Sequence, residues 1–226
     1  MSVAQTFGRQ LGLPSTLNFR PLVFVIDDDI SARDSLDLLI RSEGWQPETF
    51  ASAREFLAQP RPFIPTCLIL AVSPSDPDCL EVQKQIARDR PETPIIVISG
   101  YGDIPTAVQI MKAGAVDLLV KPCSNDDLLG AIRQGLERSR VAVDRELETR
   151  DLRTCYASLT PRETQVMGLV VSGLLNKQIG GSLGISEITV KAHRGQVMQK
   201  MKANSLADLV RMASKLQRSR SVIHLA

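Results

Sequence analysis

The stretch LVFVIDDD, residues 22–29, contains five apolar residues in succession followed by three aspartates. An apolar run of this length is typical of a strand that is buried on both faces of a sheet. Charged side chains are rarely buried without a partner, so the aspartates mark the point where the chain leaves the core. The stretch therefore predicts a buried strand, Leu22–Ile26, with an acidic cluster at its carboxyl end.

Strands and helices alternate outward from this stretch. Further apolar runs lie at Cys67–Val72, Ile95–Ile98 and Leu118–Val120, and a weaker strand at Gln46–Phe50 contains Pro47, which suits an edge position. The helical patterns between them are Ser31–Glu43, Ser52–Gln59, Leu80–Asp89 and Ile104–Ala113. Parallel neighbours need crossover helices, so this order predicts an α/β domain with a doubly wound, flavodoxin-like sheet of five parallel strands.

Polar side chains follow three of the predicted strands. Asp27 and Asp28 end the first, Ser99 follows the fourth, and Lys121 follows the fifth, just before Pro122. Each residue by itself could be a helix cap or a loop residue. The carboxyl ends of parallel strands meet at one edge of the sheet, where sites form in such folds, so together these residues indicate a site.

These residues carry a resemblance to a known family. Val25-Ile26-Asp27-Asp28-Asp29, Ile98-Ser99-Gly100 and Lys121-Pro122 resemble the receiver domain of two-component response regulators, over residues 21–137. The resemblance implies that Asp27 and Asp28 correspond to the acid pair that helps hold Mg²⁺. It also implies that Ser99 and Lys121 correspond to the hydroxyl and the cation that engage the phosphoryl group.

The same stretch of chain departs from the receiver pattern at three places. Ala71 stands where the family has its phosphate-accepting aspartate, Leu118 stands at the switch position of an aromatic residue, and the loop Ser73–Cys79 has an unusual sequence. A methyl group cannot act as a nucleophile. A single Asp-to-Ala change would explain Ala71 alone, whereas three departures favour a pseudo-receiver. Without a third carboxylate we expect Mg²⁺ to bind weakly at most, and no cofactor is expected.

Two other aspartates offer an alternative acceptor. Asp76 and Asp78 lie five and seven residues beyond Ala71, and an aspartyl phosphate needs only a carboxylate held in line near a metal. A role as polar caps of a solvated loop explains both residues without chemistry.

Charge is distributed unevenly along the 226 residues. Residues 1–150 carry 16 Lys/Arg against 21 Asp/Glu, a net charge of −5, and residues 151–226 carry 11 against 4, a net charge of +7. A basic carboxyl-terminal part indicates a nucleic-acid partner, although basic tails are often merely solvated.

The cysteines and the apolar segments exclude several classes of protein. Cys67, Cys79, Cys123 and Cys155 have no paired CxxC spacing, so we expect reduced thiols and neither a zinc site nor a disulfide framework. No apolar run is long enough to span a membrane, and residues 1–20 lack a signal peptide pattern. A cytoplasmic protein without a membrane partner is the expectation.

A helical pattern connects the two halves. Ser124 and Asp127 form a capping pair before a helical pattern over Leu128–Leu136, and Val141–Arg153 continues with good helix formers and no Gly or Pro. We expect one long or interrupted helix, which is either a solvated linker or a helix that pairs with a second chain.

The carboxyl-terminal part contains four short helical patterns. Thr160-Pro161-Arg162-Glu163 is a strong helix start that predicts Pro161–Val171, and further starts lie at Asn176, Ser186 and Ser205. A short helix, a glycine turn and a longer helix predict a helix-turn-helix in an all-α domain.

The third of these helices has two different sides. At about 100° per residue, Val190, Val197 and Met201 share one side, which we expect to pack. The opposite side has Lys191 and almost no acids, with Arg194 and Lys200 able to reach around its edges. Because acids normally balance lysines on a solvated surface, this side favours DNA.

A second resemblance covers about 55 residues. Leu159–Glu163, Asn176–Ile179, Leu183–Ser186 and Thr189–Arg194 resemble the LuxR-type domain (also called NarL-type) of FixJ-like response regulators. The family's third helix enters the major groove, usually as a dimer on paired half-sites. The resemblance implies DNA contacts from the second and third helices, drawn from Lys177, Gln178, Glu187, Ile188, Thr189, Lys191, Ala192, His193, Arg194 and Gln199.

Two points remain open in this domain. His193 could contact DNA or pack within the domain. Gly180 and Gly181 lie inside the second helix, where each costs roughly 1 kcal/mol relative to Ala, and close packing would explain only one of them.

The sequence thus predicts a DNA-binding transcription regulator that is not an enzyme. Its expected parts are an extension over residues 1–20, a receiver-like domain over 21–137, a helical linker over 138–157 and a LuxR-type domain over 158–226. Double-stranded DNA, a second copy of the chain and a sensor kinase or other regulator are the expected partners. The alternatives are a conventional regulator with a substitute acceptor and an interaction protein that does not bind DNA.

Overall fold

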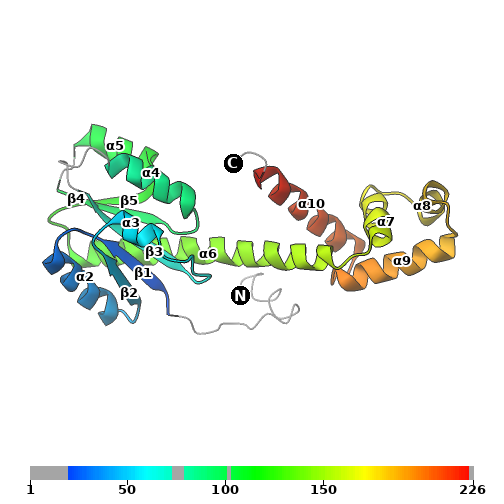
Figure 1. Cartoon of the computed structure of the whole chain (residues 1–226), viewed down its shortest axis with the longest axis horizontal. Coiled ribbons are helices and arrows are strands. Elements are labelled where there is room, and N and C mark those ends of the chain that lie inside the picture. The colour runs from blue at the N-terminus through cyan, green and yellow to red at the C-terminus, as the bar shows by residue number, and fades with distance from the viewer. Residues whose placement is uncertain (1–19, 73–78, 101–102, 224–226) are drawn as a thin grey trace. The chain divides into compact units, whose positions relative to one another are not determined.

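The computed structural model describes residues 20–72, 79–100 and 103–223, which belong to two compact units divided between Asp144 and Arg145. Figure 1 shows the secondary structure of both units. Within the described residues, no helix combines the length and the apolar character that a bilayer span requires.

The first unit is built on a five-stranded parallel sheet. The strands are β1 (Leu22–Ile26), β2 (Gln46–Phe50), β3 (Thr66–Val72), β4 (Ile95–Ser99) and β5 (Ala115–Val120), in the order β2-β1-β3-β4-β5. The expected fold class is confirmed, and β2 with its proline lies at an edge, as predicted. The structure extends the last strand back to Ala115, which pairs with Ile95.

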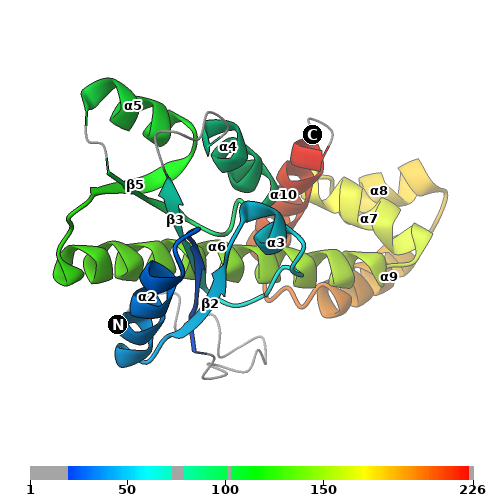
Figure 2. The same ribbon diagram turned by 60° about the vertical axis from the view of Figure 1, so that its left-hand side comes forward.

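Helices cover both faces of this sheet (Figure 2). Val23 and Val25 of β1 pack in one cluster with α2 (Ile30–Ser42) and α6 (Asn125–Ala157). Phe24 of β1 faces the other cluster with α3 (Ala53–Leu57), α4 (Cys79–Asp89) and α5 (Ile104–Lys112). This alternation explains the continuous apolar run, because each strand buries both of its faces.

Helix α6 is a single helix of 33 residues, so the expected connection is continuous. Its first part is anchored to the sheet by Ser139, whose hydroxyl accepts a hydrogen bond from the Thr66 amide (2.9 Å) and donates one to the Glu92 carbonyl (2.7 Å). Cys67 is fully buried beneath α6, and this burial raises the pKa of its thiol to about 12. Cys67 is therefore an unreactive core residue.

The second unit contains α7 (Pro161–Val171), α8 (Asn176–Leu183), α9 (Glu187–Lys200) and α10 (Leu206–Ile223). Thr160 and Glu163 form the predicted capping box at the start of α7, and Ser186 caps α9. The core lies between these helices and includes Val166, Ile179 and Val197.

A partly buried ion pair joins α7 to α9. Glu163 is only 5% exposed, and one of its carboxylate oxygens accepts hydrogen bonds from the Lys200 ammonium (2.6 Å) and from the Thr160 amide (2.8 Å). The pKa of Glu163 lies below its ordinary value, mainly because of the hydrogen bond from Lys200 and secondly because of the one from the Thr160 amide. The charged carboxylate therefore helps to hold α9 against α7.

The two adjacent glycines of α8 have different environments. A Cβ atom on Gly180 would lie 2.8 Å from the carbonyl oxygen of Ile185, and the Gly180 carbonyl accepts a hydrogen bond from the Ile185 amide (3.0 Å). Close approach of the chain after α8 therefore requires Gly180. A Cβ atom on Gly181 would meet nothing within 4 Å, and nothing in the structure explains that glycine.

Replacing these glycines separately should change stability in opposite directions. Gly180→Ala should destabilise the second unit by about 1–3 kcal/mol, because a backbone carbonyl must move. Gly181→Ala should stabilise it by about 0.5–1 kcal/mol, because alanine has the better helix propensity and space is free. Calorimetry of the full chain measures both changes. Equal melting temperatures for the two variants would contradict this account.

The Glu163–Lys200 pair should make stability depend on pH. The pKa of Glu163 is lowered in the folded protein, so the stabilisation is present above the unfolded-state pKa and is lost as pH falls through the folded-state pKa. Glu163→Gln should therefore lower the melting temperature of the second unit at pH 7, and its difference from the wild type should shrink below about pH 4.5. Glu148→Gln, which breaks an exposed pair with Lys215, is the control and should have little effect.

Candidate nucleic-acid interface and receiver site

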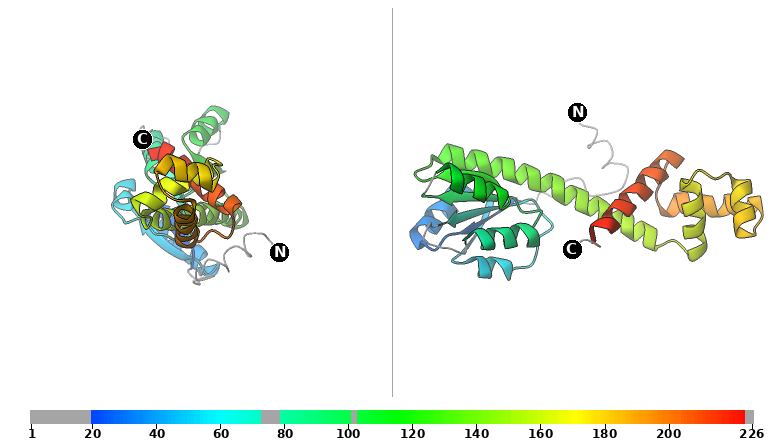
Figure 3. Two further views of the ribbon diagram at one scale, coloured as in Figure 1. Left: turned by 90° about the vertical axis from the view of Figure 1, so that its right-hand side faces the viewer. Right: turned by 90° about the horizontal axis from the view of Figure 1, so that it is seen from above.

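Helix α9 has one buried side and one open side, as its sequence predicts. Val190, Val197 and Met201 are at most 1% exposed and pack toward α7 and α8, beside which α9 lies (Figure 3). On the open side Ile188 is 82% exposed. The other exposed members of the predicted contact set on α9 are Glu187, Thr189, Lys191, Ala192 and Gln199.

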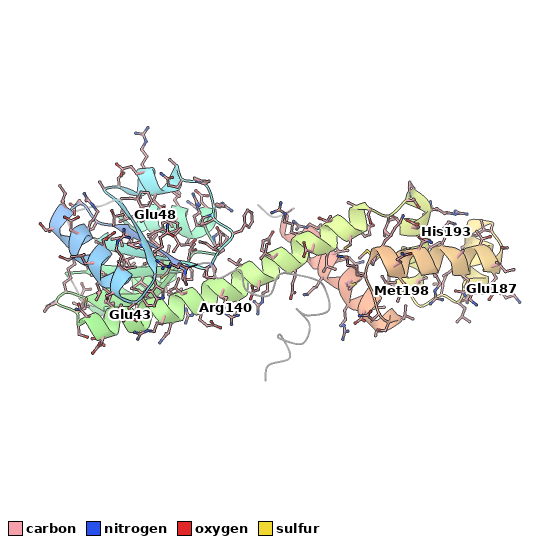
Figure 4. The ribbon with its side chains drawn as sticks, turned by 90° about the horizontal axis from the view of Figure 1, so that it is seen from below. Glu43, Glu48, Arg140, Glu187, His193 and Met198 are labelled. Carbon is pink, nitrogen blue, oxygen red and sulfur yellow. The ribbon has the colours of Figure 1, made fainter. Side chains whose placement is uncertain are left out.

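Two residues of the predicted contact set, Arg194 and His193, are partly buried in the second unit. Arg194 donates a hydrogen bond to the side-chain carbonyl of Asn176, the first residue of α8 (2.6 Å). His193 is half-buried; Figure 4 labels it between Glu187 and Met198, which lie toward the two ends of α9. Lys177 and Gln178 are exposed on the first turn of α8, where the Gln178 side chain accepts a hydrogen bond from the Leu175 amide (2.8 Å).

The expectation that Lys200 reaches the open side of α9 is wrong. Its ammonium group is bound to the buried carboxylate of Glu163. The capping box around Glu163 is visible in the sequence, but the pairing with a lysine 37 residues away is not. The sequence therefore identifies Glu163 as a helix-capping residue but not as the partner of Lys200.

The open side of α9 is suited to a polyanion. Glu187 is the single acid of the helix, and it lies in the first turn, where the helix dipole favours a negative charge. Lys191 is exposed on this side without a carboxylate partner among the described residues. Gly195 has open space around it, so another molecule could approach the backbone there closely.

The sheet brings the predicted receiver residues to one edge. Ile26 pairs with Leu70, so the residues that follow them, Asp27 and Ala71, are neighbours at the ends of β1 and β3. Ser99 ends β4 and is buried, and its carbonyl accepts a hydrogen bond from the Lys121 amide (2.8 Å).

Two basic side chains, Lys121 and Arg33, lie next to the aspartates at this edge of the sheet. The Lys121 ammonium lies 3.7 Å from one carboxylate oxygen of Asp27, and the other oxygen accepts a hydrogen bond from the Asp29 amide (2.9 Å). The Arg33 guanidinium donates to the backbone carbonyls of Asp27 (2.6 Å) and Asp28 (3.2 Å).

The residues at this edge do not fit a magnesium ion. Both carboxylate oxygens of Asp27 already face positively polarised groups, and Ala71 supplies no oxygen. In the described part of the chain, no three His, Cys, Asp or Glu side chains gather into a set that could hold a metal. Mg²⁺ needs oxygen ligands in near-octahedral geometry, and the described residues of this edge offer only the neighbouring carboxylates of Asp27 and Asp28.

Leu118 lies on β5, at the surface that β5 forms with α5. It lines an open, mainly apolar groove of about 590 Å³ with Ile104, Ala107, Val108, Met111, Lys112 and Asp117. Asp76 and Asp78, with the rest of the loop Ser73–Cys79 except the backbone of Cys79, lie outside the described residues.

Comparison with known proteins agrees with this architecture. Residues 23–133 match the family "Response regulator receiver domain", and residues 157–213 match "Bacterial regulatory proteins, luxR family".

Individual relatives match along most of the chain. Nodulation protein W of Bradyrhizobium diazoefficiens is 46% identical over 197 residues, which is 87% of either chain. Transcriptional regulatory protein FixJ of the same organism is 39% identical over 84% of this chain and 93% of its own length. Among solved structures, the response regulator StyR has a TM-score of 0.74 and 44% identity, and the match covers 87% of this chain and all of that one. The chain therefore belongs to the response-regulator transcription factors that join a receiver domain to a LuxR-type DNA-binding domain.

Proposed function

We propose that this response regulator acts on transcription without phosphoryl transfer at the usual position of its receiver. The observation that carries the proposal is the methyl group of Ala71 at the end of β3, next to Asp27. A phosphoryl acceptor must be a nucleophile, and Ala71 has none.

The surroundings of Ala71 support the same proposal. Asp27 faces Lys121, a cation that in the family engages the phosphoryl group. Leu118 is not aromatic, and an aromatic residue reports the phosphoryl group at this position in the family. The receiver then regulates the chain by packing, by dimerisation or by binding a sensor kinase or another regulator.

The open side of α9 is proposed to lie in the major groove of DNA. Lys191 is best placed to reach base edges, while Ile188 and Ala192 offer apolar contacts to thymine methyl groups. Lys177, His193 and Arg194 are proposed phosphate or groove contacts, with Gln178, Glu187, Thr189 and Gln199 at the margins of the same surface. A homodimer on two half-sites is the assembly that this arrangement favours.

Removing the charge of Lys191 should weaken DNA binding. Lys191→Ala should cost about 1–3 kcal/mol of binding free energy and reduce the slope of log K against log salt by about 1. Fluorescence anisotropy with bound genomic fragments measures both quantities. Lys84→Ala, on an exposed face of α4, is the control and should bind like the wild type. An unchanged affinity for Lys191→Ala would count against the groove assignment.

Treatment with acetyl phosphate should leave no aspartyl phosphate on this protein, because the position of the acceptor holds a methyl group. Phosphate-affinity electrophoresis measures the modification, with a receiver that has the aspartate as the positive control. A hydroxylamine-sensitive shift of the wild type would overturn the proposal. Its loss in Asp76→Asn or Asp78→Asn would then identify a substitute acceptor.

A further inference from the structure

Helix α9 ends in an unusual backbone conformation. The Ala203 amide donates to the Met198 carbonyl (2.9 Å), and the Lys202 amide donates to the Gln199 carbonyl (3.1 Å). These two bonds form a Schellman motif, whose C′ residue has a positive φ and is usually glycine. Here that residue is Lys202, with φ of 53°.

Glycine occupies the corresponding place at other helix ends of this protein. The chain turns with positive φ at Gly44, Gly114, Gly173 and Gly184, after α2, α5, α7 and α8. Among the described residues, Lys202 is the single non-glycine residue with positive φ. A Cβ atom is unfavourable in this region, so glycine would be the more stable choice after α9 as well.

The fold does not account for the lysine side chain. Met198 and Ala203, the positions whose apolar side chains accompany this motif, both pack against the core of the second unit. The Lys202 side chain is exposed, and no carboxylate of the described residues lies within ion-pair distance of it. Residues in unfavourable backbone conformations that do not stabilise the fold are often found at functional positions.

The position of Lys202 relative to Lys191 suggests the function. The two residues are eleven positions apart, which is about three turns and roughly 16 Å along a helix. The major groove is only about 12 Å wide, so a helix that crosses it at an angle extends beyond the groove within this length. With Lys191 at the base edges, the end of α9 beyond Met198 (labelled in Figure 4) would lie over the rim of the groove, where the phosphates are.

We propose that Lys202 binds a backbone phosphate of DNA. The unfavourable positive φ of this lysine is kept because its ammonium group is needed at the end of α9. The inference rests on the proposed groove position of α9. Lys202 would contribute to affinity for any sequence, because phosphate contacts carry no base information.

Three substitutions separate this role from a structural one. Lys202→Gly and Lys202→Asn remove the charge but suit a positive φ, whereas Lys202→Arg keeps the charge. The full chain is titrated onto a mixed-sequence duplex of about 30 base pairs at several salt concentrations, with Lys84→Ala as control and Lys191→Ala in parallel.

Lys202→Gly should raise the melting temperature of the second unit by a few degrees and yet weaken binding about 5–10-fold at 0.1 M salt. Lys202→Gly and Lys202→Asn should both lower the salt slope by about 0.9, and Lys202→Arg should bind like the wild type. If the only role of Lys202 were a favourable interaction of its charge with the helix dipole at the end of α9, Lys202→Gly would lower the melting temperature and leave DNA binding unchanged.

The outcomes distinguish this inference from the proposed function. Wild-type protein that fails to bind duplex at low salt would overturn both. Normal binding by Lys202→Gly and Lys202→Asn, together with weakened binding by Lys191→Ala, would overturn the role of Lys202 alone.

Discussion

The packing of α9 against α7 and α8 is the constraint on which the proposed DNA-binding surface depends. Val190, Val197 and Met201 are buried on one side of the helix, and the Glu163–Lys200 pair fixes the same side from α7. A helix held this way cannot rotate about its axis without exposing apolar side chains or breaking the partly buried Glu163–Lys200 pair. The side that carries Lys191 and Ile188 is therefore the one left to solvent.

In the receiver, a similar constraint acts through the parallel sheet. Its strand register places Asp27, Ala71, Ser99 and Lys121 at one edge of the sheet. At this edge the Lys121 ammonium faces the Asp27 carboxylate, so two of these charges lie opposite one another. The core and the site use different side chains, so the receiver fold by itself does not establish phosphoryl transfer.

The sequence by itself determined the fold class, the order of the elements and most helix boundaries. Local signals are sufficient for these: a run such as Leu22–Ile26 specifies a buried strand, and Thr160 with Glu163 specifies a helix start. The sidedness of α9 was equally predictable, because the period of a helix converts residue spacing directly into faces. That position 71 holds no nucleophile is likewise evident from the sequence, because the residue is an alanine.

Only the tertiary structure decided which partners those side chains have. Lys200 is part of an internal pair with Glu163, Arg194 is bonded to Asn176, and Gly180 is required by a carbonyl oxygen of a later residue. The conformation of Lys202 also appears only in the structure, because a lysine has no sequence signal for a positive φ. Such facts depend on contacts between residues far apart in the chain or on backbone angles, and neither is encoded in the local pattern of apolar and charged residues.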